Sequence, residues 1–311
     1  MNLKHCFLGS CFLFAFATSW SQAPDDIVGV AQVIRENYFD SARGKEIADE
    51  LMRRAKDEKL DTLTDRKDLA RRLTAMLRPI DGHFNVMYEP QATNEKATDF
   101  TMQFMEMARA SNYGFRRVDK LEDDVVVIGL SLVPVIDFSD TDDPARRAAD
   151  DALAKTVGAK AVIFDLRNNG GGDTTMVGYL VSAFVKPGAD VYNSFHERTK
   201  SSDERPAIEY PTPNTDVPLY ILTNRRTGSA AESIAFTLQS AGRAKVIGER
   251  SGGAANPGDV FSTPQGFSVF VSTGTPRNPI NGRNWEKIGV VPDIETPAEA
   301  ALERALKLAR E

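Results

Sequence analysis

Apolar positions follow two different patterns along this chain. Between residues 25 and 78 they recur every three or four positions, as on one face of a helix. Pro79 ends this region, because proline does not continue a helix. The pattern predicts a small helical domain of about three helices. The apolar positions form three successive groups: Ile27, Val30, Ile34 and Tyr38; Ile47, Leu51 and Ala55; and Leu69, Leu73 and Leu77.

Continuous apolar runs replace the helical pattern after about residue 112. Runs of this kind between helices are typical of strands that are buried on both faces, so we predict a layered α/β core. Phe84, Val86 and Tyr88 alternate as in a short strand that closes the helical part. We expect further strands at 246–249 and 267–272 and a closing helix from Pro297. The three main runs are 125–130, 161–166 and 218–223, and the helical stretches are 144–157, 174–186 and 230–241.

The first 23 residues have the pattern of a secretory signal peptide. Lys4 precedes an apolar run over residues 6–17, and residues 21–23 fit a cleavage site. The run is too short to span a membrane. We therefore expect an exported protein, periplasmic or secreted, with no stable membrane association after cleavage. The expected divisions are a signal peptide over 1–23, a helical domain over 24–92 and an α/β core over 93–311.

Composition narrows the classes of function. Both cysteines, Cys6 and Cys11, lie in the expected leader, so the mature chain would have no disulfide and no thiolate. The formal net charge is −6 and no block of basic residues occurs, which argues against nucleic acid or anionic membrane as a partner. No segment suggests an organic cofactor or a metal. The oligomeric state is not readable from the sequence.

Two polar segments follow predicted strands, where α/β proteins commonly place their sites. Gly170, Gly171 and Gly172 come directly after the run 161–166. They fit either a tight turn or an oxyanion hole made of backbone N–H groups. Ser229 lies between the run 218–223 and a helix, and by itself it fits a helix N-cap better than a nucleophile. Its segment, TGSAAE, matches neither GxSxG nor SxxK.

Few residues in the mature chain could act as a general base. Only His83 and His196 remain after the leader, and their separation together with the absence of thiols makes a zinc site improbable. His196 lies in a charged stretch that we interpret as an exposed loop. His83 lies where the helical part meets the core, a common place for a site. Glu286 stands among apolar residues before GVVPD, although a surface glutamate would explain it equally well. Of these neighbours, Trp285, Ile288, Val290 and Val291 have the character of core residues.

The order of the segments resembles that of a known family. DLRNNGGG, TGSAAE, VIGE with a glycine-rich loop, and EKIGVVPDI occur with the order and approximate spacing of the tail-specific, or C-terminal processing, serine proteases. NYGFRRVDKLEDD, DGHF and NWE are similar to one branch of that family. This branch includes interphotoreceptor retinoid-binding protein and resembles the protease core of tricorn. The resemblance implies a ClpP/crotonase-like α/β core and a peptide or protein substrate.

Two departures separate this chain from the processing proteases. About thirty residues lie between helical part and core, too few for their PDZ domain. Their catalytic lysine also has no counterpart, because Ala254 occupies its place. The tricorn-like branch uses serine, histidine and glutamate instead. Its resemblance implies Ser229 as nucleophile, His83 as general base and Glu286 as an electrostatic support.

The same resemblance implies an oxyanion hole and further residues that line the site. Gly170, Gly171 and Ala230 would form the hole, and Asn256 and Asn169 would line the site. Bacterial relatives commonly have a histidine at the position of Asn256. Tricorn has a serine directly before its histidine, where this chain has Gly82. These differences leave open a second function, a non-catalytic module that binds apolar ligands or peptides on the same fold.

Overall fold

A computed structural model describes residues 23–89, 102 and 104–311 of the chain. Apart from Ala23, the expected signal peptide lies outside the described residues. Among the helices of the described ranges, none is both long and apolar enough to cross a membrane.

The three predicted helices are present and pack through the predicted faces. They are α1 (Ala23–Asn37), α2 (Ser41–Asp57) and α3 (Arg66–Leu77), with a short 3-10 turn, η1 (Leu60–Thr62), before α3. Aspartates cap two of them: Asp40 accepts a hydrogen bond from the N–H of Arg43, and Asp65 from that of Lys67. All residues of the three predicted apolar groups are buried.

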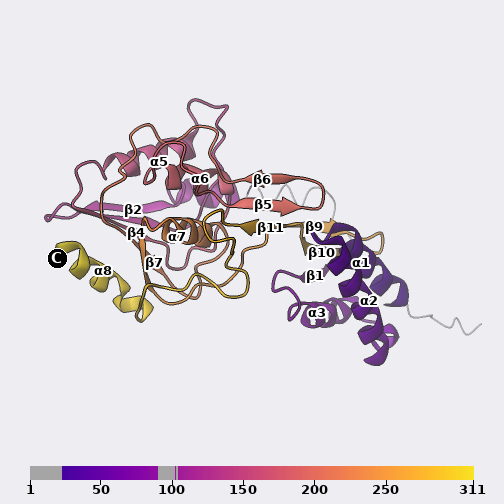
Figure 1. Ribbon diagram of the computed structural model, residues 1–311. Helices are drawn as coiled ribbons and strands as arrows, with labels where there is room; N and C mark the ends of the chain where they lie inside the picture. The colour runs from indigo at the N-terminus through magenta and orange to yellow at the C-terminus, as the bar shows by residue number, and fades with distance from the viewer. Residues whose placement is uncertain (1–22, 90–101, 103) are drawn as a thin grey trace, which may run out of the picture.

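A small antiparallel sheet completes the helical part. Its strand order is β1-β10-β9, so β10 (Phe267–Ser272) lies between β1 (Asn85–Tyr88) and β9 (Gly258–Ser262). Figure 1 shows these strands against the indigo helices, although two of them come from the C-terminal half. Phe267, Val269 and Val271 are fully buried in the same hydrophobic cluster as α1 to α3. The cluster thus extends beyond residue 92, where the predicted helical domain ends.

The second part is a layered α/β core, as predicted. Its six-stranded sheet has the order β12-β8-β7-β4-β3-β2, and only the pairing of β2 with β3 is antiparallel. The strands are β2 (Phe115–Lys120), β3 (Val125–Leu130), β4 (Ala161–Asp165), β7 (Leu219–Thr223), β8 (Lys245–Gly248) and β12 (Ile294–Glu295).

Helices cover both faces of this sheet. Val126 and Ile128 pack with α5 (Pro144–Ala154), α6 (Thr174–Ser182) and α7 (Ala230–Ser240) in the largest hydrophobic cluster. Val125 and Val127, which alternate with them along β3, pack on the opposite face with α8 (Ala301–Arg310), which follows the 3-10 turn η2 (Ala298–Ala300). Burial on both faces explains why these strands are apolar without interruption.

A third sheet joins the two parts. It has the order β11-β5-β6, formed by β11 (Gly274–Arg277), β5 (Ser194–Glu197) and β6 (Ser201–Asp203). Figure 1 shows the β5–β6 hairpin reaching toward the helices. His196 lies on β5 and is exposed, so the predicted loop is a strand. β5 pairs with β11, which is distant in sequence, so the charged segment around His196 shows no local pattern of a strand.

Candidate active site

The two polar turns meet because their strands are neighbours. β4 and β7 are adjacent and parallel, so the segments that follow them leave the sheet at the same edge. The hydroxyl of Thr227 donates to the carbonyl of Leu166 at 2.9 Å, and the N–H of Gly228 donates to the carbonyl of Asn169 at 2.9 Å. These bonds fasten the serine turn to the glycine turn.

Ser229 has a backbone conformation that residues other than glycine rarely adopt. Its φ is 52° and its ψ is −125°, at the point where the chain turns into α7. A non-glycine residue in such a conformation is strained, and strain of this kind is concentrated at functional sites. Ser229 stands at the capping-box position before α7, yet its side chain makes no cap hydrogen bond. The residue is exposed, so its hydroxyl is open to a reactant.

Gly171 packs directly against this serine. Its φ is 105°, and a Cβ placed on it would lie 2.6 Å from the Cβ of Ser229 and 2.8 Å from the carbonyl oxygen of Gly228. Both distances are shorter than atoms can approach without moving. The glycine turn therefore lies so close to the serine that only a residue without a side chain fits there.

The three predicted oxyanion donors differ in what they bind. The N–H of Gly171 already donates to Oδ1 of Asn169 at 2.8 Å. In the described part of the chain, the N–H groups of Gly170 and Ala230 make no hydrogen bond that would occupy them. Asn169 is fully buried and also donates from Nδ2 to the carbonyl of Leu130 at 2.9 Å. It supports the glycine turn from within and does not line an open surface.

Glu232 is a structural centre of the site that the sequence analysis missed. It is fully buried and accepts hydrogen bonds from the N–H of Ser229 at 2.8 Å and from Ser251, Gly253 and Ala254. Burial is the largest influence and raises its pKa, while these hydrogen bonds act in the opposite direction. The signal was present in the sequence: a glutamate three residues after a serine at a helix start has the spacing of a capping box.

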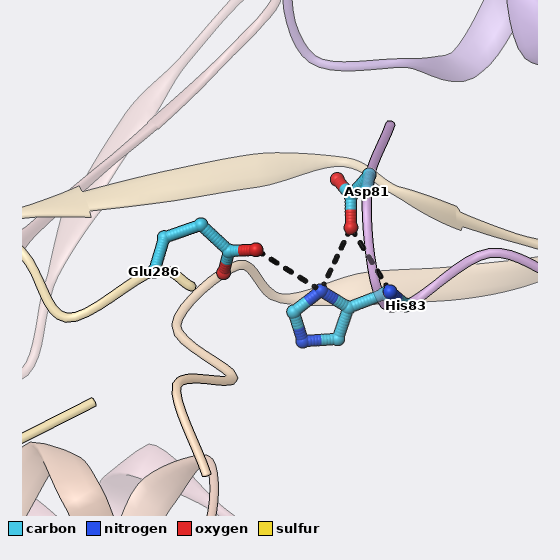
Figure 2. Close-up of side chains that lie close together, drawn as sticks. All are labelled: Asp81, His83 and Glu286. Carbon is cyan, nitrogen blue, oxygen red and sulfur yellow. Dashed lines mark hydrogen bonds and ion pairs between the residues drawn. The ribbon is translucent and has the colours of Figure 1, made fainter. Parts of the chain in front are cut away.

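His83 is held by a carboxylate that we also did not predict. Nδ1 of His83 lies 3.0 Å from Oδ1 of Asp81 and 3.8 Å from Oε1 of Glu286 (Figure 2). Asp81 is buried, whereas His83 and Glu286 are 17% and 15% exposed. The available signal was the spacing of DGH, because an aspartate often bonds to the backbone two residues later.

The charges around His83 shift two pKa values. Burial alone would raise the pKa of Asp81, but its hydrogen bonds, with those from His83 foremost, lower it to about 2. Burial also opposes a charge on His83, but the neighbouring carboxylates of Asp81, Glu286 and Glu232 outweigh it and raise the pKa of the imidazole. Asp81 is therefore ionised at neutral pH.

One loop connects Ser229 to His83. Glu232 accepts from the backbone N–H groups of Gly253 and Ala254, as described above. Oε2 of Glu286 accepts from the next two, those of Ala255 at 2.9 Å and Asn256 at 3.2 Å. Each end of the segment 253–256 is thus bound to a carboxylate beside one of the two proposed catalytic residues. Within the described residues no hydrogen bond joins His83 to Ser229 directly, and such bonds are often loose in unliganded sites.

Three residues near Glu286 differ from the expectation. Asn256 is buried, and its Oδ1 has no hydrogen-bond partner among the described residues. Ile288 and Val291 are 57% and 48% exposed, so their predicted place in the core was wrong. Trp285 and Val290 are buried as predicted. The segment from 284 to 291 turns back on itself instead of forming a strand, which explains why its apolar residues do not share a face.

Within residues 23–89, 102 and 104–311, Asp81, His83 and Glu286 form a group that could also hold a metal ion. One ligand atom of each lies within 4.8 Å of the others. However, Oδ2 of Asp81 accepts from Ser272 and Tyr38, and Oδ1 accepts from two groups of His83. Because four donors already satisfy this carboxylate, a metal would have to displace some of them. The expectation that the site holds no metal remains a prediction.

Comparisons with known proteins bear on the family and the fold of the chain. The family model "Peptidase family S41" matches residues 130–296. A carboxyl-terminal-processing protease of Picosynechococcus is 31% identical over 142 residues, which cover 46% of this chain and 33% of that protein. The match thus spans about a third of the curated relative.

Solved structures extend the likeness to the fold of nearly the whole chain. The photosystem II D1 C-terminal processing protease is 16% identical with a TM-score of 0.57, covering 94% of this chain and 97% of that one. A lipoprotein from Streptococcus agalactiae is 18% identical with a TM-score of 0.57, covering 96% and 98%. At these identities the likeness concerns the fold alone.

Proposed function

The chain belongs to peptidase family S41, and on that premise we propose that it hydrolyses peptide bonds with Ser229 as nucleophile and His83 as general base. The observation that carries the proposal is the strained, exposed serine at the start of α7, against which Gly171 packs. A serine that served only as a cap would use its hydroxyl for the cap, and Ser229 does not.

The surrounding groups suit an acyl-transfer reaction. The imidazole of His83 would take the proton of Ser229 and return it to the leaving amine. The free N–H groups of Gly170 and Ala230 are the donors for the developing oxyanion, with Gly171 held beside them by Asn169. Glu286 lies 3.8 Å from His83 and would stabilise the imidazolium electrostatically. We propose a peptide or protein substrate and no cofactor.

We also propose that the protein is exported to the periplasm or secreted. Support comes from the N-terminal sequence, with a lysine followed by an apolar run and small residues at a cleavage site. Expression of the full chain followed by N-terminal sequencing of the exported product tests this proposal. We expect the mature protein to start at or near Pro24. An intact N-terminus on protein retained in the cytoplasm would contradict it.

Labelling with a fluorophosphonate tests the nucleophile. We expect the wild type to be labelled and Ser229→Ala to remain unlabelled, with the loss of hydrolysis of a peptide library in parallel. The control is Ser194→Ala, which replaces a partly exposed serine elsewhere in the chain. Ser233→Ala is unsuitable as a control because Ser233 is buried. Equal labelling of wild type and Ser229→Ala, or of neither, would refute the assignment.

The same samples test the alternative of a binding module. Tight binding of a fluorescent fatty acid or retinoid that Ser229→Ala leaves unchanged, without peptidase activity, would support that alternative. For the peptidase, we expect a chelator such as EDTA to leave labelling and hydrolysis unchanged, since neither proposed step uses a metal. Activity that EDTA abolishes and Zn²⁺ restores would contradict the proposed mechanism without a metal.

A further inference from the structure

Asp81 is a rigidly held carboxylate beside the imidazole of His83. Its Oδ1 accepts from the backbone N–H of His83 and from Nδ1 of the ring, each at 3.0 Å. Its Oδ2 accepts from the hydroxyl of Ser272 at 2.8 Å and from that of Tyr38 at 3.2 Å. The residue is 2% exposed. Donors from three separate segments of the chain hold this carboxylate, so it cannot turn away from the ring.

We propose that Asp81, and not Glu286, is the positioning residue that fixes the tautomer of His83; this inference rests on the proposed function. An ionised carboxylate only accepts hydrogen bonds, so Nδ1 must carry the proton. Nε2 then keeps its lone pair, which a general base requires. Figure 2 shows Nε2 on the side of the ring that faces away from Asp81 and Glu286.

The position of Glu286 suits a different role. Its Oε1 lies 3.8 Å from Nδ1, beyond hydrogen-bond distance, and its Oε2 holds the N–H groups of Ala255 and Asn256. In the neutral imidazole Nδ1 carries the single ring proton, and Nδ1–H donates its hydrogen bond to the nearer carboxylate, that of Asp81. Glu286 therefore fastens the loop and adds negative charge near the ring without setting the tautomer.

The proton balance follows from this arrangement. Nε2 of His83 takes the proton of the Ser229 hydroxyl as the bond from Oγ to the substrate carbonyl carbon forms. The imidazolium then gives this proton to the amine nitrogen as the C–N bond breaks, and water repeats the sequence on the acyl-enzyme. Asp81 stays ionised throughout, because a carboxyl with a pKa of about 2 does not take the proton from an imidazolium.

Nitrogen-15 NMR of the resting protein tests the tautomer without any turnover. The sequence has three histidines, and His196→Gln separates the signal of His83 from that of its only described counterpart. Above the pKa of His83 we expect a protonated Nδ1 and a bare Nε2 in wild type and Glu286→Gln, and a mixture of tautomers in Asp81→Asn. A protonated Nε2 in wild type, or no change in Asp81→Asn, would overturn the proposal.

Kinetics on a peptide substrate supply the second test. We expect Asp81→Asn to lower kcat by about 10³- to 10⁴-fold with KM nearly unchanged, as when a serine protease loses the aspartate that orients its histidine. The acid limb of its pH profile should also lie at lower pH than that of the wild type, because Asp81 contributes to the raised pKa of His83. Glu286→Gln should lose less than Asp81→Asn, and the reverse order would overturn the assignment.

Two further variants distinguish the loss of a positioning role from misfolding. Gly82→Ala changes the residue between Asp81 and His83, and its Cβ would meet no atom within 4 Å, so activity and tautomer should be unchanged. Ser272→Ala removes one donor from Asp81 and should lower kcat while the protein stays folded. Unchanged kcat in Ser272→Ala together with an unchanged tautomer would count against the proposal. If the wild type resists fluorophosphonate, the proposed function fails, whereas the NMR experiment still decides the role of Asp81.

Discussion

Ser229 and Gly171 lie in contact where β7 and β4 leave the sheet, and both have positive φ angles. The conformation of Ser229 costs free energy in isolation, of the order of 1–3 kcal/mol, whereas a glycine adopts a positive φ without such a cost. The bonds from Gly228 to Asn169 and from Ser229 to Glu232 hold the two turns in place. At this scale, the site is a strained contact that its neighbours maintain.

The first prediction concerns Gly171→Ala. The new Cβ would overlap the Cβ of Ser229, so the serine turn must move. Because a shift of about 1 Å can cost about 100-fold in rate, we expect at least that loss of fluorophosphonate labelling. Gly158→Ala is the matched control, since Gly158 also has a positive φ but would meet no atom within 4 Å. Equal labelling of Gly171→Ala and wild type would show that the close contact does not matter.

The second prediction concerns the pH dependence of activity. His83 must be neutral to accept a proton, and its raised pKa keeps it protonated to higher pH than an ordinary histidine. We expect kcat/KM to fall on the acid side with an apparent pKa above the usual value of about 6.5. A pH profile from 5 to 9 measures it. An acid limb below the ordinary value would contradict the assignment of His83 as base.

The same shift affects stability with a definite sign. A group whose pKa is raised on folding stabilises the protein below its unfolded pKa, and this contribution disappears as pH rises through the folded pKa. His83 therefore favours the fold on the acid side. Asp81, with its pKa lowered to about 2, stabilises the fold above its unfolded value, and that contribution is lost as pH falls toward 2. Both contributions to stability come from the contact between Asp81 and His83.

Sequence reasoning identified some residues of the site and missed others for a physical reason. Ser229 was identified because its segment, TGSAAE, matches a motif of the resembling family, and His83 because only two histidines remain after the expected leader. Asp81 and Glu232 did not, because aspartate and glutamate are common on surfaces and nothing in the sequence marks these two as buried. Their spacing from His83 and Ser229 was a weak local signal, and their burial and hydrogen bonds in the fold distinguish them from solvated carboxylates.

At the scale of elements, β10 contributes buried apolar side chains to the hydrophobic cluster of the helical part. Its residues Phe267, Val269 and Val271 are fully buried against α1 to α3, although nearly 200 residues separate them in sequence. The predicted helices form where their apolar periodicity places them. Their partner sheet could not be predicted, because an isolated apolar strand does not specify which of two cores it joins.

The third prediction tests this role with Phe267→Ala. Removing a fully buried phenylalanine should lower the free energy of unfolding by about 3–5 kcal/mol. Urea unfolding followed by circular dichroism measures the loss, and hydrogen exchange in α1 to α3 should increase. Val260→Ala on β9 is the control, because Val260 is 48% exposed and should change stability by less than about 0.5 kcal/mol. Similar losses in both variants would contradict the assignment.

At the scale of the whole molecule, the site depends on how the helical part and the core are joined. His83 comes from the helical part and Ser229 from the core. Arg198, at the tip of the β5–β6 hairpin, donates to the carbonyls of Tyr38 at 2.8 Å and of Arg35. Lys287, next to Glu286, donates to the carbonyl of Ile80, next to Asp81. These bonds connect the surroundings of the proposed base to the core.

The fourth prediction concerns Arg198→Ala. It removes hydrogen bonds from a charged donor to the end of α1, so we expect the helical part to move more freely relative to the core. The rate of peptide hydrolysis should fall about tenfold, and the free energy of unfolding should fall by about 1–3 kcal/mol. Lys200→Ala, on the same hairpin with a 70% exposed side chain, should behave as wild type. Unchanged hydrolysis in Arg198→Ala would show that this junction does not position His83.

The sequence by itself determined the elements and the chemistry available to them. Apolar periodicity is a local property, so it predicted α1 to α3, the buried parallel strands and the helices between them. The order of the motifs indicated the family, and the absence of a lysine at Ala254 limited the candidates for the base.

The tertiary structure decided how these parts meet. It placed β10 with the helices, Asp81 beside His83, and Glu232 between Ser229 and the loop 253–256. Each of these contacts joins residues that local patterns treat as independent, or depends on the burial of a common polar side chain. The short spacings DGH and SAAE permit two of these contacts, but whether the carboxylates are buried, and what else they bind, is decided only in the folded chain.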